Sequence, residues 1–254
     1  MYQQALSNII EKLKTAGLYP LRQQSKLSSQ ILKERFDKVL PWAMESSKID
    51  FWIVMGKENA EDPVLKTMFT WDMPHARRVS ILVFYYDKKT KTVKPMSIGP
   101  QSPEMNKFYE NVKKSQETDC ECLSRLITEL NPQKIAIQKS EHFSFCDGLT
   151  ATLYDQLCDA LTEQQRNKLC SAEEVSVRWL QKVTPLEYNA MKVLCEITQD
   201  IVKYSFSKEV ITPGTTTTTD VEWVMRQMII DLGLDYWFGP DVDLQRKGSS
   251  VSRM

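Results

Sequence analysis

Near the N-terminus, apolar residues recur at helical spacing. A helix over residues 2–17, ending at Gly17, is predicted by one stripe made of Leu6, Ile9, Ile10 and Leu13. A second helical stripe follows Ser28 or Ser29, either of which can serve as its N-cap, and Pro41 should kink or restart that helix. The pattern therefore predicts two helices before any strand.

The next part of the chain alternates strand and helix patterns. Residues 49–55 and 78–87 are apolar runs typical of buried strands, and Lys88, Lys89 and Thr90 form a polar turn that should join the second run to residues 92–98 in a hairpin. Residues 134–138 predict another strand. Helical patterns occupy residues 104–112, 120–130 and 150–161. This order predicts an α/β fold with helices layered on a sheet.

The pattern changes after residue 170. Residues 171–182 are ambiguous, because Val175, Val177 and Trp179 alternate like a strand while Glu173 and Glu174 favour a helix. We treat residues 171–183 as a connector between a domain over residues 1–170 and a second part over residues 184–254.

In the second part, two capping boxes predict helices, one at residues 184–187 and one at residues 219–222. The first helix should run to about Phe206, and the second should end at Gly233. Tyr236, Trp237 and Phe238 then open a predicted extended segment that reaches about Arg246.

Composition and charge exclude several classes of protein. The chain has 33 Lys+Arg and 33 Asp+Glu residues, so its net charge of zero indicates no nucleic-acid or membrane partner. Its longest apolar run, residues 81–86, is far shorter than the roughly 20 residues of a membrane span. The N-terminus does not resemble a secretory signal. The six irregularly spaced cysteines, which include the close pair Cys120 and Cys122, indicate reduced thiols in a cytoplasmic protein.

Two groups of segments carry a resemblance to one known family. The first group comprises residues 183–187 (VTPLE), 210–216 (VITPGTT), 220–227 (DVEWVMRQ) and 237–246 (WFGPDVDLQR). These segments resemble the opening of the catalytic domain in the creatinase and aminopeptidase P superfamily, the pita-bread metallopeptidases, and the last of them looks like the first strand of that domain. The N-terminal domain of aminopeptidase P homologues is resembled by residues 49–55 (IDFWIVM), 58–64 (ENAEDPV), 140–143 (SEHF) and 147–150 (DGLT).

The resemblance implies a fold and an activity. The fold would be a creatinase-like N-terminal domain, with a mixed sheet flanked by helices, followed by a truncated α+β pita-bread domain. The activity would be that of a Xaa-Pro exopeptidase, in which two divalent metal ions activate a bridging water against the peptide carbonyl. In the family, two Asp, one His and two Glu hold these ions, and a further His lies near the substrate.

The sequence departs from this pattern at the metal ligands. Its two histidines, His75 and His142, both lie in the N-terminal part, and the family's ligand series follows the segment that ends this chain. Asp241 and Asp243 would share one face of a predicted strand, but their spacing differs from that of the family's pair, and we interpret them as solvated carboxylates rather than ligands. We therefore expect no catalytic, cofactor-binding or metal-binding residue in this chain, and metal ions only in a full-length relative.

Other candidate residues have two interpretations each. Glu58, Glu61 and Asp62 place negative charge before a helix, or they line the route by which substrate enters. His142 and Cys146 are four residues apart, so they form either a nucleophilic Cys–His pair or an incidental structural pair. We favour the structural interpretation of both sets.

Two functional hypotheses follow. In the first, the chain is the N-terminal portion of an aminopeptidase P-like exopeptidase, is inactive alone, and meets a peptide substrate only if the chain continues beyond Met254. In the second, it is a non-catalytic oligomerisation or protein-binding module that self-associates or binds a full-length relative, because its C-terminal helices carry broad apolar stripes.

Overall fold

The computed structural model describes residues 1–245 and 248. It contains two compact units, which we describe separately. The larger unit is Ser28–Thr184, and the smaller unit joins Met1–Leu27 to Pro185–Met254. The division into residues 1–170, 171–183 and 184–254, made from the pattern along the sequence, stays a prediction.

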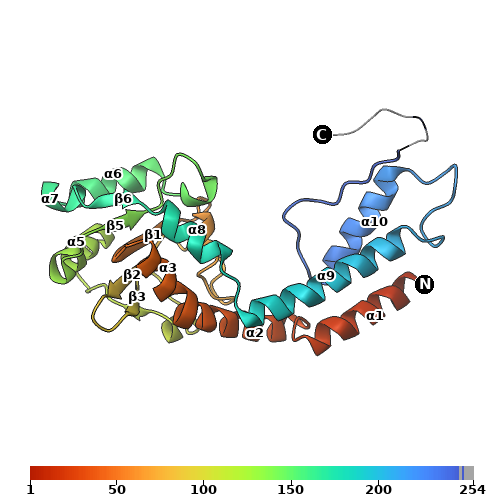
Figure 1. The fold of residues 1–254 in the computed structure, drawn as a ribbon, viewed down its shortest axis with the longest axis horizontal. Coiled ribbons are helices and arrows are strands. Elements are labelled where there is room, and N and C mark those ends of the chain that lie inside the picture. The colour runs from red at the N-terminus through yellow and green to blue at the C-terminus, as the bar shows by residue number, and fades with distance from the viewer. Residues whose placement is uncertain (246–247, 249–254) are drawn as a thin grey trace. The chain divides into compact units, whose positions relative to one another are not determined.

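A six-stranded mixed sheet forms the centre of the larger unit (Figure 1). Its order is β4-β3-β2-β1-β5-β6. The pairs β1–β2 and β2–β3 are antiparallel, whereas β1–β5, β5–β6 and β3–β4 are parallel. The strands are β1 (Phe51–Lys57), β2 (Val79–Asp87), β3 (Thr92–Ile98), β4 (Glu110–Asn111), β5 (Ile135–Ile137) and β6 (Leu169–Ser171). The predicted α/β class and the predicted hairpin are confirmed.

Helices cover both faces of this sheet. Side chains of β1 alternate between two cores, with Trp52 and Val54 in one and Phe51 and Ile53 in the other, so residues 51–55 are all apolar. The first core receives side chains from α2 (Leu21–Glu34), a π-helical turn (Arg35–Val39), α3 (Leu40–Ser46), α4 (Pro63–Lys66) and α8 (Glu173–Gln181). The second receives side chains from α5 (Asp119–Leu130) and α6 (Ala151–Ala160). A 3₁₀ turn (Ser144–Cys146) precedes α6, and the short α7 (Glu163–Arg166) follows it.

The second predicted helix is confirmed at one end and wrong at the other. The helix begins at Leu21, directly after Pro20, rather than behind Ser28 or Ser29. Pro41 lies in the first turn of α3, directly after the π-helical turn, so the predicted restart at this proline is confirmed.

The helix predicted over residues 104–112 is wrong. The structure has a 3₁₀ turn (Met105–Lys107) and then β4. Pairing with β3 accounts for this difference, because Glu110 and Asn111 join the sheet beside Met96 and Ser97. Before the turn, the Asp72 carboxylate accepts the Ser102 hydroxyl at 2.7 Å and the Glu104 N–H at 3.1 Å.

The ambiguous connector is helical and belongs to the larger unit. Residues 173–181 form α8, and Trp179 on this helix is fully buried. Glu173 and Glu174 stand in its first turn, where negative charge favours a helix. Tertiary packing of Val175 and Trp179 therefore decides between the two patterns in favour of the helix.

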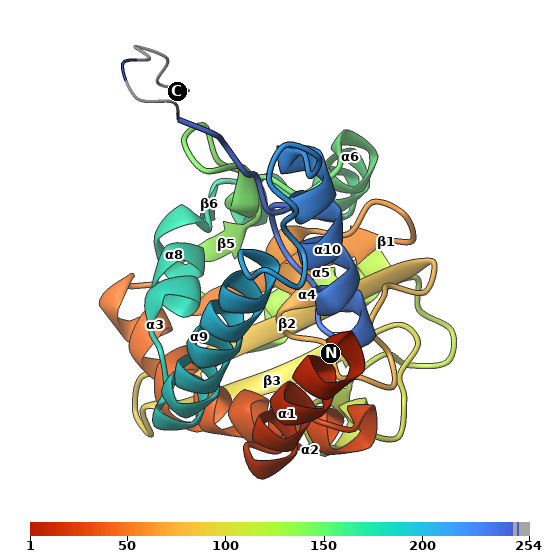
Figure 2. The ribbon, with the colours of Figure 1, turned by 90° about the vertical axis from the view of Figure 1, so that its right-hand side faces the viewer.

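The smaller unit consists of α1 (Tyr2–Thr15), α9 (Pro185–Ser205) and α10 (Thr218–Asp231), which Figure 2 shows together. Their shared core comprises Leu6, Ile9, Leu13, Leu18, Ile197, Ile201, Val221, Met225, Met228, Leu232 and Val242. The helices over residues 2–17 and 184–206 are thus confirmed.

Two predictions in the smaller unit are wrong. The capping box of α10 is formed by Thr217 and Asp220 rather than by residues 219–222. The extended segment contains no strand in its described part, residues 235–245, because no neighbouring strand pairs with it there; residue 246 lies outside the described residues. In the described part of the chain, no helix is both long and apolar enough to cross a membrane.

Candidate functional site

Asp62 is the buried centre of the larger unit's polar interactions. Its side chain is fully buried, and Oδ1 accepts the backbone N–H groups of Val64 at 2.8 Å and Leu65 at 3.0 Å. It is therefore the N-cap of α4, which confirms the interpretation of this residue as charge placed before a helix. The carboxylate of Asp62 is thus shielded from solvent in this structure.

Gln138 connects Asp62 to three further parts of the unit. Its Nε2 donates to the Asp62 carboxylate at 3.3 Å, while its Oε1 accepts the indole N–H of Trp52 at 3.0 Å and the hydroxyl of Ser176 at 2.9 Å. We call these four residues, Asp62, Gln138, Trp52 and Ser176, the Asp62 network. It joins β1, the loop before α4, the end of β5 and α8.

Gly148 closes the network from the loop after β5. A Cβ atom at this position would lie 2.2 Å from Asp62 Oδ2 and 2.6 Å from Asp62 Cα, so only glycine fits. Burial raises the pKa of Asp62 to about 6, although hydrogen bonds from Leu65, Val64, Gln138 and Gly148 offset part of this rise. The network is thus a tightly packed structural junction with one titratable group.

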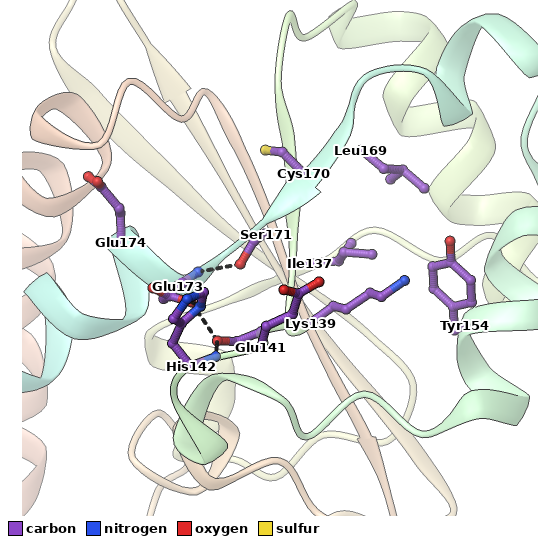
Figure 3. A pocket seen from close by; sticks show the side chains of 11 residues that line it. Ile137, Lys139, Glu141, His142, Tyr154, Leu169, Cys170, Ser171, Glu173 and Glu174 are labelled. Atoms are coloured by element: carbon purple, nitrogen blue, oxygen red, sulfur yellow. Dashed lines mark hydrogen bonds and ion pairs between the residues drawn. The ribbon is translucent and has the colours of Figure 1, made fainter.

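A solvent-facing pocket of about 520 Å³ lies beside the carboxyl ends of β5 and β6. Ligands of open α/β sheets bind at this kind of edge, so we consider it the candidate site. We call it the β5–β6 pocket (Figure 3), and its lining comprises Ile137, Lys139, Ser140, Glu141, His142, Tyr154, Leu169, Cys170, Ser171, Glu173 and Glu174.

Glu173 organises one side of the pocket. Its Oε2 accepts the Ser140 hydroxyl at 2.6 Å and lies 3.6 Å from Nδ1 of His142. The Ser140 oxygen in turn accepts the backbone N–H groups of His142 at 3.1 Å and Phe143 at 3.0 Å. This arrangement holds the loop after β5 against the start of α8.

Lys139 and Tyr154 form the other side of the pocket. The Lys139 ammonium lies 4.8 Å from the centroid of the Tyr154 ring, a cation–π contact. Figure 3 shows Lys139 extending towards Tyr154, whereas Glu174 and Cys170 are directed elsewhere. The pocket therefore offers carboxylates and an ammonium group to polar ligands.

The three acidic candidates do not form one cluster. Glu58 is exposed, and Asp62 is buried in its network. Glu61 Oε1 lies 3.9 Å from Nδ1 of His75, whose side chain is 73% exposed. None of the three lines the β5–β6 pocket, and their role in lining a substrate route stays a prediction.

His142 and Cys146 both contact Glu173, but through different groups of that residue. His142 is at the surface beside Glu173, whereas Cys146 is buried and its Sγ donates to the Glu173 carbonyl at 3.9 Å. Burial raises the pKa of Cys146, which disfavours a thiolate nucleophile. Burial likewise raises the pKa of Cys122, here to about 11.

The described residues contain no group of three His, Cys, Asp or Glu side chains that could hold a metal ion. Asp241 and Asp243 lie in the irregular part of the smaller unit, so the shared strand face predicted for them is wrong. The side chains of residues 1–245 and 248 therefore do not fit a two-metal site.

Sequence reasoning missed Arg35, which is only 7% exposed. Its guanidinium donates to the carbonyls of Lys182, at 2.9 Å, and Trp179, and lies 4.2 Å from the centroid of the Trp179 ring. These contacts satisfy carbonyls at the C-terminal end of α8. A single Arg in an amphipathic helix carries no sequence signal for such a role.

Comparison with known proteins gives a similarity at the level of structure but none at the level of sequence. No protein-family model and no curated protein matches the sequence. Among solved structures, the Xaa-Pro dipeptidase from Bacillus anthracis is similar with a TM-score of 0.46 and 16% sequence identity, over 80% of this chain and 49% of that chain. The chain thus spans about half the length of that structure, and a similarity at this level does not assign it to a family.

Proposed function

We propose that the chain is the N-terminal portion of an aminopeptidase P-like Xaa-Pro exopeptidase and that it is not a catalyst by itself. The Asp62 network is the observation that supports this proposal. Residues 58–64, 140–143 and 147–150 resemble the N-terminal domain of that family. In the structure, Asp62 from the first segment and Gly148 from the third pack directly against each other.

This packing gives Asp62 and Gly148 a structural role that requires no part in catalysis. Asp62 caps α4, Gln138 satisfies its carboxylate, and Gly148 allows the close approach. Residues that form a buried, hydrogen-bonded junction stabilise the fold of a domain. In this proposal, the larger unit is the non-catalytic domain of the peptidase, and the two metal ions would need ligands that the described residues do not supply.

An activity assay tests the proposal. The purified chain is incubated with a Xaa-Pro dipeptide and a longer Xaa-Pro peptide, in the presence of Mn²⁺, Co²⁺ or Zn²⁺, and release of the first amino acid is measured. We expect no release above the rate with metal ion alone. Metal-dependent release by the chain would contradict the proposal.

The mass of the native protein completes this test. A mass well above 29.5 kDa in the source cells would support a peptidase that continues beyond Met254. A native mass of 29.5 kDa would favour the second function, a non-catalytic binding module. The observation that favours this second function is the number of exposed apolar side chains in the smaller unit, among them Trp223 and Phe238 at 64% and 82%.

A further inference from the structure

The β5–β6 pocket carries groups of opposite charge in its lining. On one side, the Lys139 ammonium extends towards the ring of Tyr154 and lies 4.8 Å from its centroid (Figure 3). On the other side, the Glu173 carboxylate lies 3.6 Å from Nδ1 of His142. Glu141 adds a further carboxylate to the lining. A ligand in this pocket therefore meets both an ammonium group and carboxylates.

Several of these charges remain available to a ligand. Within residues 1–245 and 248, the charged groups of Lys139 and Glu141 take part in no hydrogen bond or ion pair, and both residues are exposed. Glu173 uses only Oε2 for the hydrogen bond to the serine hydroxyl. Glu174 differs, because its carboxylate pairs with Arg178 at 2.7 Å and is directed elsewhere (Figure 3). The lining thus offers two carboxylates, those of Glu141 and Glu173, and one ammonium group.

The pocket also has an apolar part. Ile137 is only 3% exposed and Leu169 is half-buried, and both belong to the core on the α6 side of the sheet. An aliphatic stem packs on such a surface while the charged group at its end stays in a polar environment. The volume of about 520 Å³ lies within the range of about 300–1,000 Å³ that small-molecule sites have. The pocket therefore suits a small molecule with an aliphatic stem and several charged groups.

We propose that the β5–β6 pocket binds a free basic amino acid, lysine or arginine. With His142 neutral, two carboxylates and one ammonium group are complemented by a ligand with two positive groups and one negative group. A basic amino acid carries these three groups, namely the α-ammonium, the side-chain cation and the carboxylate. In the complex, Lys139 pairs with the ligand carboxylate, and Glu141 and Glu173 pair with its two cations. This inference does not rest on the proposed peptidase relationship.

An NMR titration of the backbone amides of the unmodified chain, with lysine and with arginine, tests the proposal. Because much of the lining is exposed to solvent, we expect a dissociation constant on the order of 0.1–1 mM. The shifts should be concentrated at residues 137–142, 154 and 169–174, which would identify the pocket as the site. A titration that does not saturate, or shifts concentrated in another part of the chain, would overturn the proposal.

Three analogues of lysine test which of its groups the pocket recognises. Norleucine lacks the side-chain cation, cadaverine lacks the carboxylate, and 6-aminohexanoate lacks the α-ammonium. Each should bind about threefold or more weakly than lysine, because one charged group of the pocket then loses its partner. Equal binding of norleucine and lysine, or of cadaverine and lysine, would contradict the proposed complementarity.

Two variants test the assigned contacts. Lys139→Met keeps an apolar stem without the ammonium, and Glu141→Gln keeps the shape without the charge, so each should weaken lysine binding about threefold or more. Lys139→Met should not weaken cadaverine, which has no carboxylate to lose a partner. Lys134→Met, at the opposite end of β5, and Glu58→Gln, in the loop before α4, are the matched controls and should leave the dissociation constant unchanged. All four side chains are exposed, so the fold should tolerate each change. The proposal is wrong if Lys139→Met and Glu141→Gln bind lysine as tightly as these controls.

Discussion

The two compact units bury their apolar residues to very different degrees. In the larger unit, the most exposed large apolar side chain is Phe143 at 47%, whereas Trp237 and Phe238 in the smaller unit are 75% and 82% exposed. A sheet covered by helices on both faces gives every strand two buried sides. Three helices around one core bury one stripe each, so a second apolar stripe on α9, which includes Tyr188 and Met191, stays at the surface.

The units also differ in where their polar contacts lie. The Asp62 network is buried in the larger unit, and every member has a hydrogen-bond partner. In the smaller unit, two long-range side-chain pairs are at the surface, Lys12 with Asp200 at 2.5 Å and Tyr2 with Asp231 at 2.7 Å. Surface pairs of this kind contribute little stability, whereas a buried network is costly to disturb.

The largest effect is expected from Gly148→Ala in the larger unit. The new methyl group would overlap the backbone of Asp62, which cannot move without breaking the cap of α4, so we expect a loss of about 4 kcal/mol in the free energy of unfolding. Gly17→Ala in the smaller unit is the control: Gly17 has φ +72° and open space around its Cα, so the loss should be only about 1 kcal/mol. Urea unfolding measures both, and equal losses would refute the tight junction.

The next largest effect is expected from Leu13→Ala. Leu13 is fully buried in the core of the smaller unit, and we expect a loss of about 3 kcal/mol from the cavity. Hydrogen exchange should show faster exchange in α1, α9 and α10 and unchanged protection in β1 and β2. Leu157→Ala, at an equally buried position in the larger unit, should give the reverse pattern. Loss of protection in both units from either variant would show that they unfold as one.

The smallest effect is the pH dependence of the Asp62 network. Because the folded-state pKa of Asp62 is raised from 3.8 to about 6, the folded chain binds this proton more tightly than the unfolded chain. The contribution of Asp62 is therefore most favourable below about pH 4 and declines as the pH rises to about 6, by about 2 kcal/mol between pH 4.5 and pH 7.

Asp62→Asn removes this titration while keeping an oxygen that can cap α4. The stability of the unmodified chain relative to that of the variant should therefore decline as the pH rises from 4.5 to 7. Glu58→Gln, in the same loop but exposed, should leave the pH profile of the unmodified chain unchanged. Parallel profiles for the unmodified chain and Asp62→Asn would show that Asp62 does not titrate in this range.

The elements with strong local patterns were predictable from the sequence. The hairpin of β2 and β3 has an apolar first strand followed by a polar turn, and α1 and α9 carry clear buried stripes. The helix predicted at residues 104–112 failed because Glu110 and Asn111 pair with β3, a contact between segments that the local pattern does not show. Of the candidate residues, Asp62 was recognisable as a charge before a helix, but its contact with Gln138 links positions far apart in the chain and has no local signal.

By itself, the sequence determined the α/β class of the larger unit, its central hairpin and the helices of the smaller unit, because hydrophobic period and turn residues act over short distances. The tertiary structure alone decided that α8 is a helix, that Arg35 holds its end, and that Asp62, Gln138 and Gly148 meet. It also decided which apolar stripe of α9 is buried. Both stripes have the spacing of a core-facing helix, and only the number of neighbouring elements available to cover them distinguishes one from the other.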